Sequence, residues 1–419
     1  MNGRRRFLEL AVLAGCAFIL STAVLSLMVG GGSDPAEEGP IWGLIRSVSY
    51  LSVALILLPY YQETLYVLRR NWPLLALLLL AFVSCLWTEM PGVTLRRSIA
   101  VSGTTLLGVA LAVRLTLEEQ LLLLSWLFRI MAVLSLACVV FLPSYGISDF
   151  AGHEWRGVFN YKNVFGSIMA LSILVEWQLP ADTRLSRTLK QLALLLSAIL
   201  LFFAGSITPA VALGASLLLI EMYKVATQQL RIPVYATVLV VVLMVSSGMM
   251  AFGVNGGAIA GALGRSSDLT GRTEIWSWVV SSISDRPILG YGYSGFWDGA
   301  SASISVDHAL GATLMYSHNG YLETLLNLGA VGFVLTLAFL GTGVKRAYYW
   351  SEHGQSRAGL WPLAFLLFFL LHNFGECTIF FQDLQWSICV AVVAGTDRVL
   401  FAPDAEQEEL LLEPSAELT

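Results

Sequence analysis

Two segments at the ends of the longest polar stretch in this apolar chain carry the residues best suited to chemistry. The stretch follows an apolar run that ends at Val254 and precedes another that begins near Ala330. GRSSDLTGR (264–272) stands near its start, and SHNGYLETLLNLGAVG (317–332) closes it. Arginines bind phosphate groups through paired N–H donors, and a neutral histidine accepts a proton. Beside a membrane, this combination predicts binding of a lipid diphosphate together with proton transfer.

A larger set of basic residues falls in predicted outer loops or at the outer ends of predicted spans. Each one alone has an ordinary explanation, because Arg and Lys at a membrane interface commonly reach lipid phosphates. Together they favour an anion site, because arginines from several loops can surround a diphosphate at one face of a helical bundle. The set is Arg46, Arg96, Arg97, Arg156, Lys162, Arg265, Arg272 and Arg286.

The histidine lies at a predicted helix start. Residues 320–328 have helical spacing, and Asn319 is a favoured N-cap residue. His318 then lies just outside a helix N-terminus, where the dipole and nearby arginines favour the neutral ring. A lone histidine is more often structural, so this position alone leaves both roles open.

The residues between the two basic segments predict one helix and one turn-rich segment. RTEIWSWVVSSI (272–283) has its apolar residues Ile275, Trp276, Val279, Val280 and Ile283 on one side at helical spacing. A helix in the membrane interface and a helix packed on the roof of the bundle fit this pattern equally. DRPILGYGYSGFWDG (285–299) contains helix-breaking Pro and Gly, and its aromatic residues favour an interfacial belt over a sugar-stacking wall.

The elements that must position these residues are membrane-spanning helices. Of the 419 residues, 56% are hydrophobic and 13% are charged, and the mean hydropathy of +0.72 excludes an ordinary soluble domain. A bilayer core of about 30 Å requires about 20 helical residues. We expect an all-α polytopic membrane protein with about twelve spans. They run near 7–30, 41–60, 72–88, 98–114, 120–142, 163–180, 188–205, 208–226, 232–254, 328–345, 358–374 and 383–401.

Basic residues in short loops orient this arrangement with both termini in the cytoplasm. The chain then divides into nine spans within 1–254, a large outer loop at 255–327, three spans within 328–401 and an acidic cytoplasmic tail at 402–419. The basic start and the long run from Phe7 indicate an uncleaved first span rather than a signal peptide. Five scattered cysteines show neither a disulfide framework nor zinc-ligand spacing.

Ionisable residues elsewhere favour structural roles. Arg129 lies inside the fifth predicted span, and Glu176 in the next span is a candidate partner; we favour an ion pair over a proton relay. Glu323 and Glu376 are candidates to orient His318 or an acceptor, with helix capping and ion pairing favoured. His372 and Asn373 border a cavity or make interhelical hydrogen bonds, of which the second is more ordinary.

Several of these segments resemble the bacterial O-antigen ligase and polymerase superfamily. Arg265, three residues and Leu269 match one family motif, and His318, Asn319, nine residues, Gly329, two residues and Gly332 match the other. WRGVFNYKN (155–163), LTGRTEIW (269–276) and RPILGYGYSGFW (286–297) resemble the exopolysaccharide polymerase branch.

The resemblance implies glycosyl transfer at the periplasmic face of the bacterial inner membrane. The donor is an undecaprenyl diphosphate-linked glycan, and the acceptor is lipid A-core in ligases or another lipid-linked repeat unit in polymerases. By motif match Arg265 and His318 are the catalytic residues, with Arg156, Lys162 and Arg272 as diphosphate-binding residues by weaker local similarity. The loop at 255–327 becomes the periplasmic catalytic loop.

The residues also predict the mechanism. Cations that bind the diphosphate more tightly as the glycosidic bond breaks lower the barrier, and His318 takes the acceptor proton in one inverting displacement. No Asp-x-Asp pair lies in an outer loop, so we predict that the reaction needs no metal ion. We also expect no other cofactor and no nucleic-acid partner.

Two choices remain open. A lipid-linked oligosaccharide flippase would share the hydrophobicity and the cations, but its cations should line a path through the membrane rather than gather at one face. Ligase and polymerase share the donor site and differ in the acceptor, which the sequence does not name.

Overall fold

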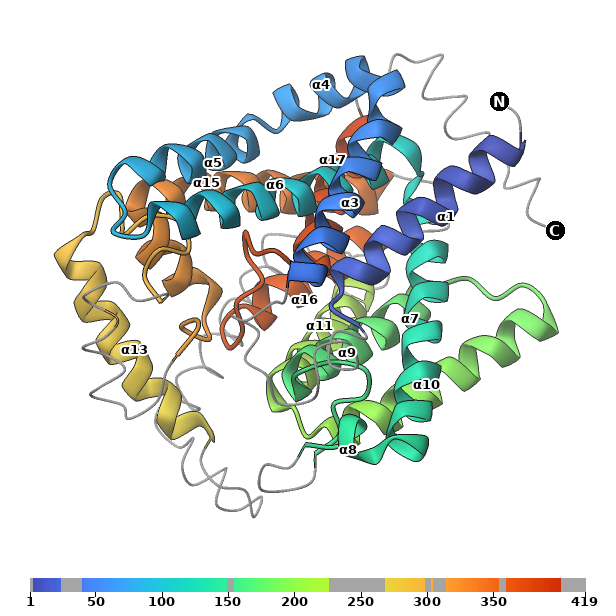
Figure 1. Ribbon diagram of the computed structural model, residues 1–419. Helices are drawn as coiled ribbons and strands as arrows, with labels where there is room; N and C mark the ends of the chain where they lie inside the picture. The colour runs from blue at the N-terminus through green and yellow to red at the C-terminus, as the bar shows by residue number, and fades with distance from the viewer. Residues whose placement is uncertain are drawn as a thin grey trace.

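The chain folds as a bundle of α-helices (Figure 1). This computed structural model describes residues 3–23, 40–148, 154–225, 268–297, 303, 314–353 and 359–400. Within those ranges the regular structure is helical, apart from an isolated bridge between Ile147 and Trp155.

Proline and capping side chains set several helix starts in the first part of the chain. Proline stands in the first turn of α5 and α6, where its missing N–H breaks no helical hydrogen bond. Thr116 and Glu119 form a capping box at the start of α7. The helices are α1 (Gly3–Leu20), α3 (Pro40–Leu57), α4 (Tyr61–Arg70), α5 (Trp72–Val83), α6 (Pro91–Arg114), α7 (Leu117–Phe141) and α8 (Pro143–Gly146).

The second part of the chain supplies the central helices and α13, which lies at the edge of the bundle in Figure 1. A capping box between Thr183 and Ser186 begins α10, and Gly205 ends it with a left-handed backbone (φ 63°). The helices are α9 (Lys162–Gln178), α10 (Arg184–Ala204), α11 (Ile207–Lys224), α13 (Asp268–Asp285), α15 (Gly320–His353), α16 (Trp361–His372) and α17 (Leu384–Leu400).

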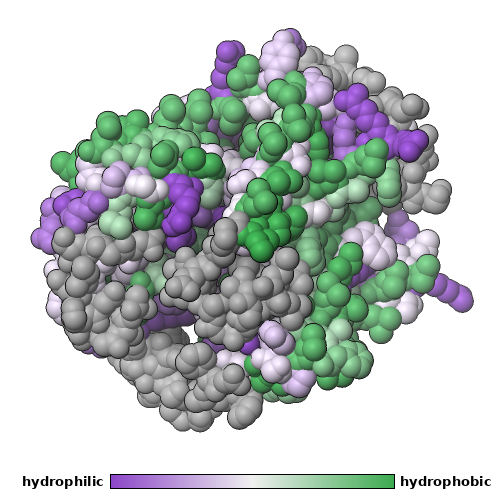
Figure 2. All heavy atoms as spheres, viewed as in Figure 1, coloured by the Kyte–Doolittle hydropathy of each residue, from purple (hydrophilic) through white to green (hydrophobic). Residues whose placement is uncertain are grey.

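The length and surface of these helices confirm an all-α polytopic membrane protein. Five stretches in the described residues are long and apolar enough to cross a bilayer: Ile41–Arg70, Leu117–Phe141, Arg184–Ala204, Ile207–Lys224 and Gly320–Glu352. Figure 2 shows apolar side chains along α1, α3 and α5 on the outer surface, and Leu51, Leu79 and Val133 are more than half exposed. An apolar outer surface is what a helix bundle presents to lipid.

Polar contacts join helix ends that were predicted to share one side of the membrane. At the predicted cytoplasmic ends, Arg114 pairs with Glu9 at 2.7 Å, and Asp397 pairs with Arg346 at 3.1 Å and Arg70 at 3.3 Å. These pairs link α1 with α6, and α17 with α15 and α4.

Predicted outer ends contact one another in the same way. Glu89 pairs with Arg286 at 3.2 Å, and the Tyr293 amide donates to Ser84 Oγ at 2.9 Å. Arg97 and Arg114 lie near opposite ends of α6, which at 1.5 Å per residue places their backbones about 25 Å apart. The polar contacts between helices therefore lie at two separate ends of the bundle, as expected when successive spans run in opposite directions.

Helix α15 is interrupted at Gly329, which separates its short first part, next to His318, from its membrane-spanning part. The short helix predicted at 320–328 and the span predicted at 328–345 form the single helix α15, with non-helical backbone at Gly329 (φ 62°, ψ −163°). In the gap, the amides of Ala330 and Val331 donate to the carbonyls of Pro287 and Ile288 at 2.8 and 3.2 Å. The break thus holds the segment after α13 against α15.

The helix α13 packs on the bundle, as the roof arrangement predicts. Val279 is fully buried in a small core with Phe296 and Leu326, and Ile275 and Ile283 pack against it. Val280 was predicted to lie on the buried side of this helix, but 51% of its surface is exposed.

The prediction of an interfacial aromatic belt at 285–299 is wrong for its described aromatic residues. Tyr291, Tyr293, Phe296 and Trp297 are all buried. The Tyr293 hydroxyl donates to the Phe380 carbonyl at 2.8 Å. The glycines between these residues bend the segment inward, so its rings fill a core instead of facing lipid.

The predicted ion pair inside the bundle is confirmed. Arg129 on α7 binds Glu176 on α9 through two hydrogen bonds of 2.8 Å, and Ser125 donates to the same carboxylate at 2.7 Å. Glu176 is fully buried.

The number of membrane spans and the large outer loop stay predictions. The predicted span at 232–254, much of the predicted loop and the tail at 402–419 lie outside the described residues.

Candidate active site

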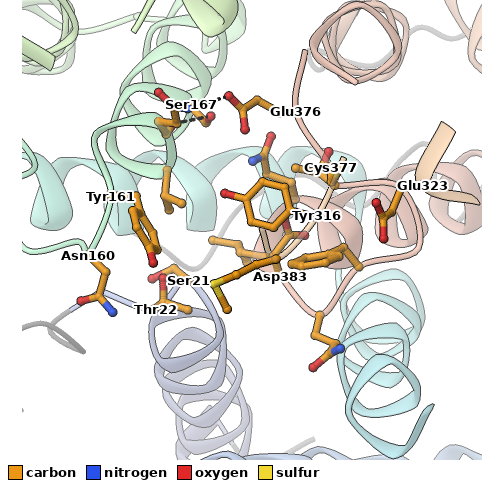
Figure 3. Close-up of a pocket in the computed structure, with 18 of the residues that line it drawn as sticks. Ser21, Thr22, Asn160, Tyr161, Ser167, Tyr316, Glu323, Glu376, Cys377 and Asp383 are labelled. Atoms are coloured by element: carbon orange, nitrogen blue, oxygen red, sulfur yellow. Dashed lines mark hydrogen bonds between the residues drawn. The ribbon is translucent and has the colours of Figure 1, made fainter. Parts of the chain in front are cut away.

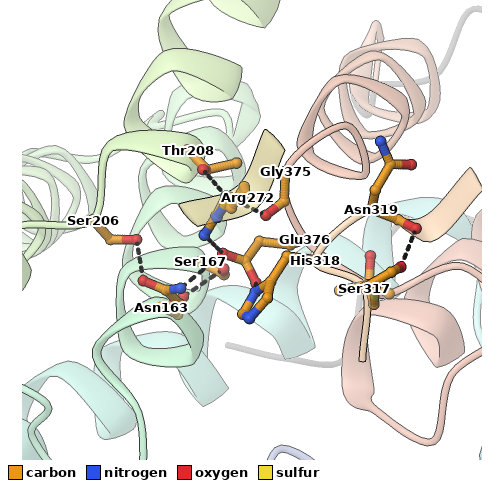
Figure 4. Close-up of polar contacts among 12 residues, drawn as sticks. Asn163, Ser167, Ser206, Thr208, Arg272, Ser317, His318, Asn319, Gly375 and Glu376 are labelled. Carbon is orange, nitrogen blue, oxygen red and sulfur yellow. Dashed lines mark hydrogen bonds and ion pairs between the residues drawn. The ribbon is translucent and has the colours of Figure 1, made fainter. Parts of the chain in front are cut away.

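Glu376, between α16 and α17, joins two of the predicted site residues (Figure 4). Its Oε1 accepts hydrogen bonds from Arg272 Nη2 at 3.1 Å and from Asn163 Nδ2 at 2.9 Å. Its Oε2 lies 3.9 Å from His318 Nδ1. One buried carboxylate therefore divides its oxygens between a guanidinium and an imidazole.

Arg272 reaches this carboxylate from α13. Its Nη1 also donates to the Gly375 carbonyl at 2.6 Å and to Thr208 Oγ1 at 3.2 Å. A guanidinium has five N–H groups, and these contacts with described residues use three of them. Arg272 thus holds α13 to α11 and to the Glu376 loop while it keeps donors for an anion.

His318 occupies a backbone conformation that few residues other than glycine adopt. Its φ is +54°, a left-handed geometry in which histidine is enriched but which stores strain of about 1–3 kcal/mol. The ring lies 4.5 Å from the Tyr316 ring, centroid to centroid. Nδ1 is buried without a hydrogen-bond partner among the described residues, and a quarter of the side chain remains exposed.

The predicted N-cap beside His318 is confirmed. Asn319 Oδ1 accepts from the amides of Tyr321 and Leu322, both at 3.1 Å, at the start of α15. The Gly320 amide donates to the carbonyls of Asn373 and Glu376, both at 2.9 Å. The helix start that carries His318 is therefore tied directly to the loop that carries Glu376.

Glu323 supports the loop before His318 rather than the imidazole itself. Its carboxylate accepts from the Ser317 amide at 2.8 Å, from Trp297 Nε1 at 3.1 Å and from Asn327 Nδ2 at 3.1 Å. On the other side, Trp276 Nε1 donates to the Ser317 carbonyl at 3.0 Å. These contacts fix the residue next to His318 from two directions.

The charges around Glu376 keep it ionised. Burial is the largest influence and acts to raise the pKa of Glu376, but His318 and the positive charge of Arg272 together lower it below its ordinary value. The site therefore contains a carboxylate anion between a guanidinium and an imidazole.

The other predicted diphosphate ligands occupy different surroundings. Arg156 donates to the carbonyls of Tyr145 and Ser144 at 2.8 and 3.3 Å, at the end of α8. Lys162 pairs with Glu154 at 2.9 Å and begins α9, next to Asn163. Arg265 lies outside the described residues. The structure thus brings Arg272 and His318 together and shows Arg156 and Lys162 engaged with neighbouring parts of the chain.

A cavity of about 190 Å³ lies beside Glu376 (Figure 3). Glu376 and Tyr316 line it, whereas Arg272 and His318 do not. Its wall continues to α3, α6 and the start of α17 through Arg46, Arg97 and Gln385. Glu376 therefore lies between Arg272 and a partly open cavity.

Comparison with known proteins finds a family model and a relative that match parts of the chain. Residues 192–337 match the model of the O-antigen ligase family. This region of the chain is similar to the O-antigen ligase family. It is also 31% identical over 88 residues to the exopolysaccharide production protein ExoQ of Rhizobium meliloti (strain 1021), an alignment that covers 20% of each chain. These matches confirm the superfamily resemblance.

The matched O-antigen ligase region contains Arg265, Arg272 and His318, but Glu376 and Asn163 lie outside it. The sequence suggested Glu376 as a candidate to orient His318 or an acceptor, with helix capping and ion pairing favoured, and did not single out Asn163. The signal for Asn163 was its place in WRGVFNYKN (155–163), just before an apolar run. Nothing in the sequence shows that this asparagine and Glu376, 213 positions apart, share a hydrogen bond.

Proposed function

We propose that this protein is a glycosyltransferase that moves a glycan from an undecaprenyl diphosphate-linked donor to an acceptor hydroxyl. The observation that carries the proposal is the arrangement of Arg272 and His318 on opposite oxygens of Glu376. The match of residues 192–337 to the O-antigen ligase family supports it independently. The acceptor is lipid A-core in ligation or a lipid-linked repeat unit in polymerisation.

Arg272 supplies positive charge for the leaving diphosphate. As the bond from the anomeric carbon to the diphosphate oxygen breaks, negative charge grows on that oxygen, and a guanidinium stabilises it. Arg265 shares this role in the proposal, with Arg156 and Lys162 as further ligands. Because the leaving group is already anionic, no general acid is required.

His318 removes the acceptor proton. The acceptor oxygen forms a bond to the anomeric carbon as its proton passes to His318 Nε2, so one displacement inverts the anomeric configuration. Glu376 stabilises the resulting imidazolium through Nδ1 and holds the ring in the required orientation, a role that carboxylates play beside catalytic histidines. The 3.9 Å separation leaves room for this contact to shorten when substrate binds.

The proposed setting is the bacterial inner membrane, with about twelve spans and a periplasmic catalytic loop at 255–327. The contacts that gather predicted outer ends apart from predicted cytoplasmic ends support this sidedness. The mechanism requires no metal ion.

Reconstitution tests the activity. Purified protein in liposomes receives an undecaprenyl diphosphate-linked glycan and an acceptor in the presence of a chelator, and glycan transfer is measured on a gel. The proposal predicts transfer that chelation does not reduce. Movement of the lipid-linked glycan across the bilayer without transfer would contradict it and identify a flippase.

A further inference from the structure

We infer that the cavity beside Glu376 binds one sugar residue next to the bond that is made or broken. This inference rests on the proposed function and adds the place where the glycan itself is recognised. This sugar belongs either to the donor glycan or to the acceptor. Both present the same chemistry, a ring that bears hydroxyl groups.

The charge of the cavity wall argues against a second diphosphate site. Two guanidiniums, those of Arg46 and Arg97, line it together with three carboxyl groups, those of Glu323, Glu376 and Asp383. The ionised Glu376 carboxylate would repel a diphosphate, whereas a neutral ligand with both donors and acceptors is compatible with groups of either sign. Sugar hydroxyls have this property.

Two residues of the cavity wall carry buried polar atoms that have no hydrogen-bond partner in the described part of the chain. Gln385 is 5% exposed and its Oε1 has no hydrogen-bond partner in the described part of the chain. His372 is fully buried; its Nε2 contacts Ser167 Oγ at 2.9 Å, but its Nδ1 also lacks a described partner. Buried polar atoms are nearly always paired, so two residues of one cavity wall that each carry such an atom favour a polar ligand.

The size and the aromatic lining fit a single ring. The cavity of about 190 Å³ is close to the volume of one hexose. Tyr161, Tyr316 and Phe381 line it, and aromatic rings present apolar faces to the C–H faces of sugars. The volume admits one residue rather than a whole repeat unit.

Steady-state kinetics of the reconstituted full-length protein test the inference. Gln385→Met keeps the side-chain length and removes the amide. We expect the KM for one glycan substrate to rise about three- to tenfold, as for loss of one hydrogen bond, with kcat within about twofold. A rise in the donor KM assigns the sugar to the donor, and a rise in the acceptor KM assigns it to the acceptor; either result supports the inference.

Two further measurements keep the test independent of folding and of the proposed function. Tyr161→Leu, at a position with 41% of its surface exposed, removes a ring from the wall and should raise the same KM. Gln178→Met, at the far end of α9 and outside the cavity, is the matched control and should change neither KM. Binding of undecaprenyl diphosphate without sugar should be equal in the wild type and in Gln385→Met.

The outcomes separate the two proposals. Unchanged KM values for both substrates in Gln385→Met and in Tyr161→Leu, with normal wild-type transfer, would overturn the sugar site alone. Absence of transfer by the wild type would instead overturn the proposed function.

Discussion

At the scale of single residues, the chemistry depends on how Glu376 uses its two oxygens. Glu376→Gln preserves the shape and the oxygen that faces Arg272 and Asn163 but removes the charge beside His318. We expect kcat to fall about 10- to 100-fold, less than the roughly 10²- to 10⁴-fold that a general base contributes. Transfer assays with Glu221→Gln, at the other end of the bundle on α11, provide the control and should give wild-type rates. Equal kcat values for Glu376→Gln and the wild type would remove Glu376 from the mechanism.

The same residue makes stability depend on pH. Because the folded protein lowers the pKa of Glu376, its carboxylate contributes stability above the ordinary glutamate value of about 4.3, and this contribution is lost as pH falls through the lowered value. Thermal unfolding between about pH 6 and pH 3 should therefore show a smaller decrease of the midpoint in Glu376→Gln than in the wild type. Parallel decreases in the two proteins would show that this carboxylate is not stabilised by its neighbours.

At the scale of elements, the break in α15 positions the catalytic loop. A Cβ at Gly329 would lie 2.3 Å from the backbone of Ile288 and would occupy a left-handed backbone (φ 62°). Gly329→Ala should lower the free energy of unfolding by about 2–4 kcal/mol and reduce transfer, because the segment docked in the break must move. Gly341→Ala in the same helix, where a Cβ meets nothing within 4 Å, should be neutral or slightly stabilising in the same thermal assay. Equal effects of the two substitutions would show that the break has no special role.

The ion pair between α7 and α9 is an element-scale prediction of a different kind. Arg129→Met leaves the buried Glu176 carboxylate unpaired and should destabilise the protein by about 3–5 kcal/mol. The double variant Arg129→Met, Glu176→Gln should recover most of the loss and retain transfer. A stable double variant without transfer would favour a proton relay over the structural pair.

At the scale of the whole molecule, the sequence predicts what is periodic or local. Apolar runs identified the helical membrane class, and Asn319 identified a helix start, because both signals lie within one element. The contacts of Glu376 with Asn163 and Arg272 join α9, α13 and the loop after α16, so no local pattern predicts them. The aromatic residues at 291–297 were assigned to the interface because composition alone does not distinguish a ring facing lipid from one in a small core.

The topology of the whole molecule gives a prediction about labelling. In a cysteine-free background, Ser284→Cys at the end of α13 should react with a membrane-impermeant maleimide added to the periplasmic side of intact cells. Ser186→Cys at the start of α10 should react only after the membrane is opened. Ser284 is exposed and Ser186 is partly exposed, and labelling of both from one side would contradict the alternating spans.

The central claim is that Arg272 and His318 act on one lipid-linked reactant around Glu376. Its most direct test compares wild type and His318→Asn, a substitution that tolerates the left-handed backbone, for transfer and for binding of undecaprenyl diphosphate-linked glycan in liposomes with a chelator. The account predicts that transfer falls at least about 100-fold while binding changes less than about threefold. Transfer by His318→Asn at the wild-type rate would contradict it.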